Sequence, residues 1–227
     1  MGFSDHLVDA GEDLWDAQLH HPFVRELADG SLDESAFRVW LEQDYRYLLD
    51  YARTFATLGT KAADEPTMAH CFEVANAIVD EEMDLHRSFA ADYGLTADDL
   101  AAVEKSPTCE AYTNFLLRTA QQRPFPVGAA AIYPCGQGYL DVADHMADLA
   151  DGEHRYTPFI EKYTSDAFRE SVAWMGELVD RSAEAHPSLR DDMKAAFRRS
   201  AELEYAFWEM AHTEEEWPSE RASAEVV

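Results

Sequence analysis

Apolar residues recur at intervals of three and four positions along almost the whole chain, and this spacing limits the possible folds most strongly. Such spacing is typical of amphipathic helices that bury one face. Alternating β-branched runs joined by Asn-Gly turns, which would indicate strands, are absent from the sequence. The pattern therefore predicts an all-α fold, a bundle of helices around an apolar core.

Capping residues and helix breakers divide this pattern into segments. We predict helices over about residues 4–20, 22–28, 33–60, 64–94, 106–122, 127–150, 156–163, 165–185 and 188–212, with one short helical turn after Thr96. Neither an internal repeat nor a long linker separates them, so the sequence predicts a single domain over residues 1–212. Residues 213–227 are polar and acidic, and we expect them to form a C-terminal tail.

Acidic residues greatly outnumber basic ones. The chain holds 45 Asp and Glu against 18 Lys and Arg, which gives a formal net charge of −27. Because such a surface repels phosphates and anionic lipids, we expect neither nucleic acid nor membrane among the partners. The acidic residues come in pairs and triplets, and we interpret them as adaptation to a salty cytosol. A protein that evolved to bind cations is the alternative.

Targeting signals and cysteine frameworks are also missing. The first residues lack a basic region followed by an apolar run, and no stretch of eighteen apolar residues occurs, so we expect neither signal peptide nor membrane span. Three cysteines are too few for a disulfide framework, and without a CxxC pair a structural zinc site is not expected. The sequence thus predicts a cytoplasmic protein with free thiols.

Three acidic residues, Asp44, Glu82 and Glu204, interrupt apolar stripes that are predicted to face the core. The stripe that contains Glu82 runs through Met68, Phe72, Ala75, Val79, Glu82, His86, Phe89 and Tyr93. A buried ionised carboxylate is costly unless it is paired or hydrogen-bonded. Structural bonding to Tyr, Trp or His would explain one such residue. Several of them favour a polar pocket inside the bundle. The inward tyrosines that accompany them are Tyr47, Tyr112, Tyr139 and Tyr163.

Cys135 is the candidate nucleophile. Pro134 cannot donate to the helix ladder, so it kinks the helix or begins a new segment. In the second case Cys135 lies near a helix N-terminus, where the dipole favours thiolate. Gly136 and Gly138 remove bulk beside the sulfur and leave room for a ligand, and Tyr139 lies one turn further on. The alternative is a small buried cysteine at a packing kink.

A metal centre is the competing interpretation of the buried acids. Bundles hold two metals with two Glu-x-x-His motifs and two further Glu residues. The chain has a single such motif, from Glu209 to His212, and it lies off the apolar stripe. Glu82 and His86 are four residues apart and could chelate. Because the second motif is missing, we predict no metal site. No esterase elbow, P-loop or GxGxxG supports other common chemistries.

Four short motifs stand in order on successive predicted helices. They are Trp40-x-x-Gln43-Asp44-Tyr45-x-Tyr47-Leu48, Pro134-Cys135-x-x-x-Tyr139, Tyr163, and Glu204-x-x-Phe207-Trp208. Together they resemble the TenA family, whose members are thiaminase II or aminopyrimidine aminohydrolase enzymes with an all-helical, haem-oxygenase-like fold. The resemblance covers about residues 4–212. With Cys135 in place, the chain resembles the Cys-containing class.

The resemblance implies hydrolysis of a small-molecule pyrimidine substrate. Aminomethylpyrimidine loses its amine to give hydroxymethylpyrimidine, and thiamin is cleaved to a pyrimidine alcohol and thiazole. The family needs no cofactor and is usually homotetrameric. The sequence leaves the preferred substrate open among thiamin, aminomethylpyrimidine and a formylated precursor. It also leaves two other functions open: a cofactor- or di-metal-dependent oxygenase of the same fold, similar to enzymes that form pyrroloquinoline quinone, or a catalytically silent binding bundle.

Residue roles follow from the same resemblance. Cys135 would attack the pyrimidine, Glu204 would contact a ring nitrogen with Tyr163 and act as acid and base, and Asp44 would bind the exocyclic amine and help activate Cys135. The residues that would line or stack on the ring are Tyr47, Tyr112, Tyr139 and Phe207. Glu82 would be a supporting or structural acid. The chemistry suits these residues, because aromatic walls fit a flat ring and a proton on a ring nitrogen assists thiolate addition.

Overall fold

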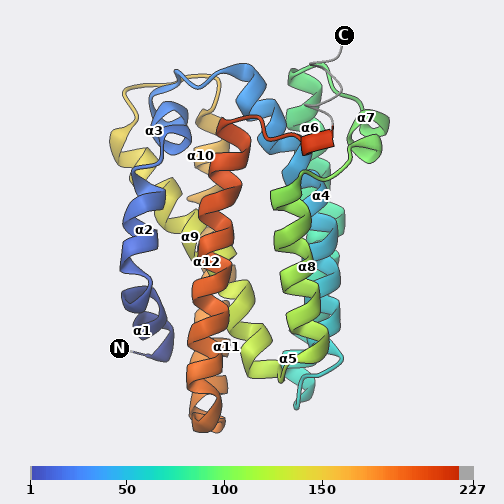
Figure 1. The fold of residues 1–227 in the computed structure, drawn as a ribbon, viewed down its shortest axis with the longest axis vertical. Helices are drawn as coiled ribbons and strands as arrows, with labels where there is room; N and C mark the ends of the chain where they lie inside the picture. The colour runs from blue at the N-terminus through green and yellow to red at the C-terminus, as the bar shows by residue number, and fades with distance from the viewer. Residues whose placement is uncertain (1, 220–227) are drawn as a thin grey trace. The chain divides into compact units, whose positions relative to one another are not determined.

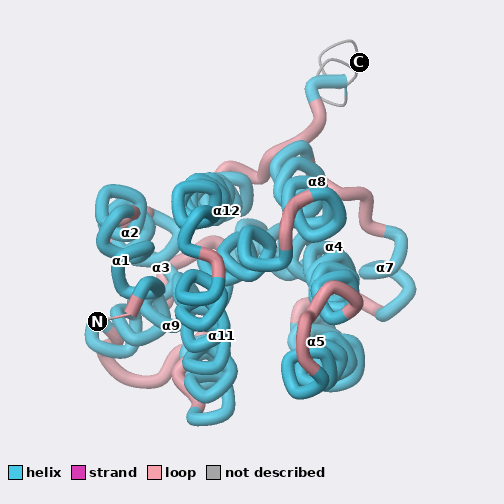
Figure 2. The backbone as a smooth tube through the Cα atoms, turned by 90° about the horizontal axis from the view of Figure 1, so that it is seen from below, coloured by secondary structure: helices cyan, strands magenta, loops and turns pink. Residues whose placement is uncertain are grey.

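The computed structural model describes residues 2–219, apart from the side chains of Glu81 and Leu85. Helices, turns and loops make up this part of the chain, which contains no strand (Figure 2), so the predicted all-α class is confirmed. None of the helices described here is long and apolar enough to cross a membrane. The helices belong to two compact units, residues 2–32 with 118–208 and residues 33–117 with 209–219. The single domain over 1–212 stays a prediction, and residues 220–227 of the predicted tail lie outside the described residues.

The first unit is assembled around α9. Its elements are α1 (Phe3–Ala10), α2 (Glu12–Leu19), α3 (Pro22–Asp29), α9 (Phe125–Leu149), α10 (Thr157–Tyr163), α11 (Asp166–Ala185), a 3₁₀ turn (Pro187–Leu189) and most of α12 (Arg190–His212). α9 and α11 lie side by side (Figures 1 and 2), and α3 and α10 also pack on α9. Side chains with almost no exposure form its core, among them Leu7, Phe23, Leu27, Ile132, Met146 and Phe197.

One predicted helix of the first unit is two helices. The segment 4–20 breaks at Gly11, which ends α1 and precedes α2. A Cβ atom at Gly11 would lie 3.3 Å from a ring carbon of Phe197, closer than most Cβ contacts. The glycine therefore lets the turn approach α12, and this contact is not visible in the local sequence pattern. The end of α3 follows the prediction, because Gly30 adopts the left-handed conformation (φ 79°) that favours glycine.

The second unit is assembled around α4. Its elements are α4 (Glu34–Gly59), α5 (Glu65–Ala77), a π-helix (Ile78–Glu82), α6 (Met83–Asp92), α7 (Ala97–Ala102) and most of α8 (Pro107–Gln122). α4 and α5 lie side by side (Figures 1 and 2). Two helix caps form here as predicted: Asp64 Oδ1 accepts from the N–H of Thr67 at 2.9 Å, and Thr96 shares a capping box with Asp99. Asp33 precedes α4 but makes no side-chain capping bond, contrary to prediction.

The predicted stripe of helix 64–94 is wrong over its first half. Met68, Phe72 and Val79 are 37%, 42% and 48% exposed. α5 instead buries Thr67 and Cys71. The π-helix then inserts one extra residue into the turn, which rotates every later side chain by roughly a quarter of a turn relative to a uniform α-helix. A prediction that assumes 3.6 residues per turn throughout the segment therefore cannot place both halves of the stripe on the buried face.

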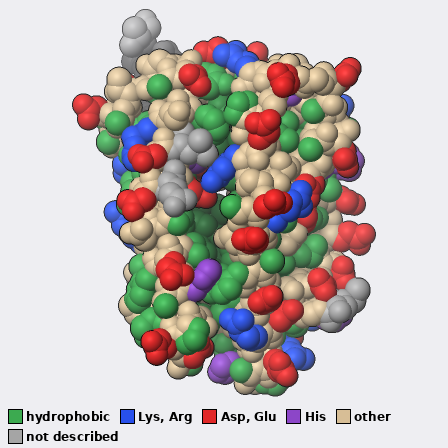
Figure 3. All heavy atoms as spheres, turned by 180° about the vertical axis from the view of Figure 1, so that it is seen from behind, with side chains coloured by type: hydrophobic (Ala, Val, Ile, Leu, Met, Phe, Trp, Pro, Cys, Tyr) green, Lys and Arg blue, Asp and Glu red, His purple; other side chains and the backbone are tan. Residues whose placement is uncertain are grey.

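The surface carries far more acid than base. Acidic side chains are spread over the face shown in Figure 3, where basic ones are fewer. Some of the acids pair, as in the contacts of Arg198 with Asp13 (2.7 Å) and of Arg123 with Asp192 (2.8 Å). Because 45 acidic residues face 18 basic ones, most acidic groups cannot be neutralised in this way.

Candidate active site

Cys135 lies in the middle of α9. That helix runs from Phe125 to Leu149 without interruption and contains Pro134. Of the two alternatives at Pro134, a kink or a new segment, the structure rules out the new segment, so α9 places no N-terminus at Cys135 to favour a thiolate. An internal proline costs about 3 kcal/mol. Burial of the neighbouring Ile132 and Tyr133 on the same helix offsets that cost.

Exposure separates Cys135 from the other two cysteines. Cys135 is partly exposed, whereas Cys71 and Cys109 are buried. Burial raises the pKa of Cys71 to about 11 and that of Cys109 to about 12. Both buried thiols are therefore protonated and shielded at neutral pH. Among the three, Cys135 is the thiol that a small molecule can reach.

The two glycines after Cys135 differ in their surroundings: Gly136 is tightly packed, whereas a Cβ atom at Gly138 would make only an ordinary van der Waals contact. A Cβ at Gly136 would lie 3.0 Å from Met175 Sδ on α11, and one at Gly138 would lie 3.7 Å from Gln18 Oε1 on α2. The expectation that Gly136 leaves room for a ligand is wrong, because α11 already fills the space over it. A glycine next to the thiol thus lets α9 and α11 approach closely.

Aromatic rings of the first unit gather around Tyr139, one turn after Cys135 on α9. The ring centroid of Tyr139 lies 5.0 Å from that of Tyr163 on α10 and 4.9 Å from that of Trp208 on α12. Phe159 lies 4.8 Å from Tyr163. Two of the predicted ring-binding residues are thus brought together in one cluster. A flat, electron-poor ring fits such walls.

Glu204 and Phe207 lie on the same helix as Trp208. Both are 2% exposed. The prediction that Glu204 is a core-facing acid therefore holds in the structure. Removal of its carboxyl group from water disfavours the ionised form unless neighbouring groups stabilise it.

In the second unit, the predicted substrate-binding acid Asp44 contacts a histidine. Asp44 on α4 and His86 on α6 are 4% and 3% exposed, and Oδ2 of Asp44 lies 2.6 Å from Nε2 of His86. The other ring nitrogen, Nδ1, lies 2.9 Å from the carbonyl oxygen of Glu82 at the end of the π-helix. Burial by itself lowers the pKa of His86, but the hydrogen bond and negative charge of Asp44 outweigh it, so that this pKa is raised.

The stripe pattern correctly predicts that His86 faces the core, and it leaves the role of this histidine open. We considered it with Glu82 as a chelating pair, yet both of its ring nitrogens face protein groups. Among the residues described, no three His, Cys, Asp or Glu side chains come together as a metal site. The predicted absence of metal and cofactor stays a prediction. Glu82 contributes its backbone carbonyl to His86, and its side chain is partly exposed.

Three tyrosines of the second unit form an aromatic cluster. Tyr47, three residues after Asp44 on α4, and Tyr112 on α8 are 3% and 1% exposed. Their ring centroids lie 5.0 Å apart, and Tyr51 lies 5.4 Å from Tyr47. Asp44, Tyr47 and Tyr112 thus share the second unit, whereas Cys135, Glu204, Tyr139, Tyr163 and Phe207 belong to the first.

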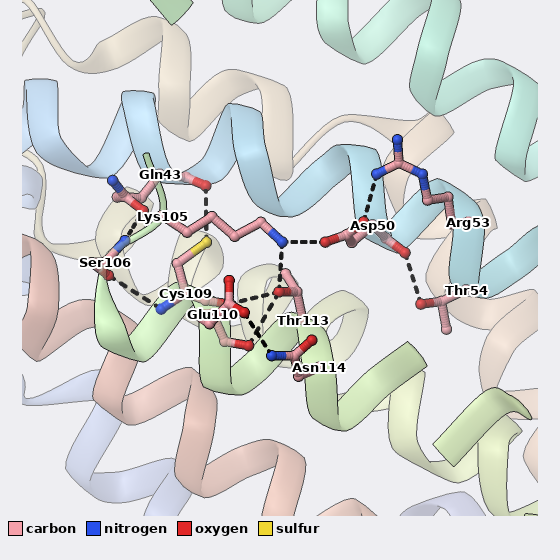
Figure 4. A network of polar contacts seen from close by, with 10 residues as sticks. All are labelled: Gln43, Asp50, Arg53, Thr54, Lys105, Ser106, Cys109, Glu110, Thr113 and Asn114. Carbon is pink, nitrogen blue, oxygen red and sulfur yellow. Dashed lines mark hydrogen bonds and ion pairs between the residues drawn. The ribbon is translucent and has the colours of Figure 1, made fainter. Parts of the chain in front are cut away.

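A second buried acid of α4, which the sequence analysis did not single out, has a structural role. Asp50 is 6% exposed and pairs with Lys105 and, at 2.6 Å, with Arg53 (Figure 4). Burial would raise its pKa, but the two cations outweigh burial and lower it. Lys105 also donates to Thr113 Oγ1 at 2.9 Å. Every charge in this network is paired, so it fixes the loop before α8 onto α4.

Cys109 belongs to the same network. Its thiol donates to the carbonyl oxygen of Gln43 at 3.5 Å (Figure 4). Gln43 in turn donates to the carbonyl of Glu104 at 3.0 Å and accepts from the N–H of Ser106 at 2.9 Å. These contacts identify Cys109 as a packing residue, in agreement with its raised pKa.

Comparisons with known proteins find similar sequences and structures along nearly the whole chain. The model of the TENA/THI-4/PQQC family matches residues 9–214. An aminopyrimidine aminohydrolase of Halalkalibacterium halodurans is 34% identical over 220 residues, which cover 96% of this chain and 98% of that protein. A solved TenA homologue from P. horikoshii OT3 superposes with a TM-score of 0.88 at 28% identity, over 94% of this chain and 99% of the other. A protein with a heme oxygenase-like fold from Shewanella denitrificans, 16% identical with a TM-score of 0.74 over 92% of each chain, confirms the predicted fold type.

Proposed function

The chain belongs to the TENA/THI-4/PQQC family, and from this premise we propose that it is an aminopyrimidine aminohydrolase of thiamin salvage or degradation. The observation that carries the proposal is the near full-length similarity to an aminopyrimidine aminohydrolase, at 34% identity over 96% of this chain. The partly exposed Cys135 and the aromatic rings around Tyr139 support it, because a thiol beside flat walls suits attack on a pyrimidine.

The reaction exchanges the amine of aminomethylpyrimidine for a hydroxyl group. The Cys135 thiolate adds to the electron-poor ring while Glu204 delivers a proton to a ring nitrogen. The ring, now electron-rich, expels ammonia from the adjoining methylene carbon, and water adds to that carbon. Loss of the thiolate then restores the aromatic ring and gives hydroxymethylpyrimidine. Asp44 accepts a hydrogen bond from the exocyclic ring amine, and the tyrosines hold the ring.

A direct product assay tests this function. Purified protein is incubated with aminomethylpyrimidine, thiamin and a formylated aminopyrimidine, first separately and then in competition. Mass spectrometry should detect hydroxymethylpyrimidine, with ammonia released in equal amount from aminomethylpyrimidine. The competition identifies the preferred substrate. If none of the three substrates yields hydroxymethylpyrimidine, the proposed function is wrong.

We expect the activity to survive exhaustive chelation. The proposed steps use a thiolate and carboxyl groups of this chain, and His86 directs both ring nitrogens at protein groups. The measurement is the rate before and after dialysis against a strong chelator, together with the metal content of the protein. Activity that disappears on chelation and returns with iron or manganese would favour the oxygenase alternative.

The acidic surface is expected to make stability depend on salt, as adaptation to a salty cytosol requires. With a net charge of −27 per chain, and more if the chain is the homotetramer that its family implies, self-repulsion is severe in dilute buffer. The Debye length falls from about 10 Å at 0.1 M salt to about 3 Å at 1 M. The melting temperature should therefore rise steeply as KCl increases into the molar range.

Calorimetry and light scattering across that range check both parts of the expectation. The melting temperature should rise with KCl, and the mass in solution should fall toward that of one chain when salt is removed. A neutral osmolyte that matches the water activity of each KCl solution is the control, because it does not screen charge. A melting temperature that stays flat with KCl would point to another cause of the acidic surface, such as a cationic partner.

A further inference from the structure

His86 is the buried group that contacts Asp44 most closely, and no step proposed so far uses it. The distance of 2.6 Å between Nε2 and Oδ2 is that of a strong hydrogen bond. The side chains of His86 and Asp44 are 3% and 5% exposed, so water does not compete with the contact. Trp40 covers the imidazole, with ring centroids 5.8 Å apart. The pair is thus fixed by its surroundings as well as by the bond.

The second contact of His86 decides where its protons lie. The carbonyl oxygen of Glu82 can only accept, so Nδ1 must carry a hydrogen. A single proton then lies between Nε2 and Oδ2. It belongs either to an imidazolium that faces a carboxylate or to a carboxylic acid that faces a neutral imidazole. The raised pKa of His86 favours the imidazolium and the carboxylate.

The other titratable groups nearby do not reverse this assignment. Glu82, on the π-helix, adds negative charge that also favours the imidazolium. Cys109, which feels the charge of Asp44 from α8, is a neutral thiol with a pKa of about 12. Asp50, which is also buried on α4, is paired with Lys105 and Arg53. The other charged residues of α4, α6 and α7 are at least partly exposed, among them Glu42, Arg46, Asp84, Arg87, Asp98 and Asp99.

The π-helix is what presents His86 to α4. One extra residue in the turn Ile78–Glu82 rotates the following side chains by roughly 100° about the helix axis. After this change His86 and Ala90 are buried, whereas Val79 within the turn is 48% exposed. The irregular turn also ends at Glu82, whose carbonyl oxygen orients the imidazole. π-helical turns of this kind often occur at functional sites.

We propose that His86 is a positioning residue, which holds the Asp44 carboxylate ionised and fixed through Oδ2 so that Oδ1 accepts a hydrogen bond from the amino group of the substrate. This role rests on the proposed function, because it assigns the amino group to Asp44. His86 acts on the substrate only through Asp44. A carboxylic acid in place of the carboxylate could turn a donor toward the amino group and bind it poorly.

Nuclear magnetic resonance tests the ionisation without any substrate. The imidazole nitrogens of His86 are assigned by comparison with the His86→Gln variant and titrated in the wild type and in Asp44→Asn. We expect His86 in the wild type to stay doubly protonated well above the usual histidine pKa of about 6.5. In Asp44→Asn its pKa should fall by about one unit or more, because burial then acts without a counter-charge. An identical titration in both proteins would overturn the proposal.

Kinetics of His86→Gln test the consequence for catalysis. The amide can still donate a hydrogen bond to Asp44, but it places no positive charge beside the carboxylate. We expect kcat/KM for aminomethylpyrimidine to fall about tenfold. We also expect the acid limb of the pH profile of kcat/KM to move upward by about one pH unit. The matched control is His21→Gln, which replaces another buried histidine, 1% exposed, whose Nδ1 accepts from the N–H of Phe23 at 3.2 Å.

His21→Gln should lower the melting temperature and leave the acid limb in place. If His86→Gln folds and converts the substrate but the acid limb of its kcat/KM profile stays at the wild-type pH, His86 is merely structural. If the wild type releases no product from any aminopyrimidine, the proposed function fails on its own, and the titration of His86 still decides whether the ion pair exists. The two failures are therefore distinguishable.

Discussion

Replacing Cys135 with Ala is expected to lower turnover of the pyrimidine substrate by about a thousandfold or more and to leave the fold intact. The thiolate supplies the covalent step, and water cannot replace it as an attacking group at the same rate. The loss of one sulfur from a partly exposed side chain leaves only a small cavity, so the melting temperature should change little. Steady-state rates and calorimetry on the same preparation measure both quantities.

Cys71→Ala and Cys109→Ala are the matched controls. Both thiols are buried, with pKa values raised to about 11 and 12, and Cys109 is hydrogen-bonded to Gln43. Their removal should lower stability and leave kcat nearly unchanged. Alkylation with iodoacetamide should modify Cys135 first in the native protein. A loss of turnover in either control equal to that in Cys135→Ala would contradict the choice of nucleophile.

Helix type and most helix ends could be predicted because their causes are local. Asp64 caps α5 through Thr67, three residues away, and Gly30 ends α3 through its own backbone conformation. The break at Gly11 depends on a distant contact instead, because Gly11 is packed against Phe197 on α12. At Pro134 the sequence predicts one helix but leaves a new segment open, and α9 continues through this residue. Local preference alone could not decide between continuation and interruption at these positions.

The candidate site could be predicted where a polar residue stands at a position that the apolar stripe predicts to be buried. Asp44 and Glu204 stand out because each lies in an apolar stripe, and both are buried. The pairing of Asp44 with His86 joins residues 42 positions apart, and the π-helix that enables it has no simple sequence signature. The role of Gly136 was missed for a similar reason, since Met175 on another helix occupies the space above it.

Glu204→Gln should lower kcat by about a hundredfold or more while the protein stays folded. The proposed step needs a proton delivered to a ring nitrogen, and positioned acids contribute about 10² to 10⁴ to such steps. Glutamine keeps the shape of the side chain and carries no acidic proton. Glu204 is 2% exposed, and a neutral amide is no harder to bury at this position than a carboxylate. The melting temperature of the variant should therefore not fall greatly.

Glu202→Gln is the control on the same helix, since Glu202 is partly exposed and pairs with Arg199 at 2.7 Å. It should leave kcat unchanged, because Glu202 has no part in the proposed reaction. Surface pairs contribute at most about 1 kcal/mol to stability, so the variant should also stay folded. Asp44→Asn should behave differently from Glu204→Gln, raising KM and lowering kcat together, because it disturbs substrate binding in both the ground and transition states. If Glu204→Gln instead unfolds the protein and Asp44→Asn is silent, both residues are structural acids. A proton donor must then be sought among the tyrosines, of which Tyr163, 5.0 Å from Tyr139, would be the first to replace with Phe.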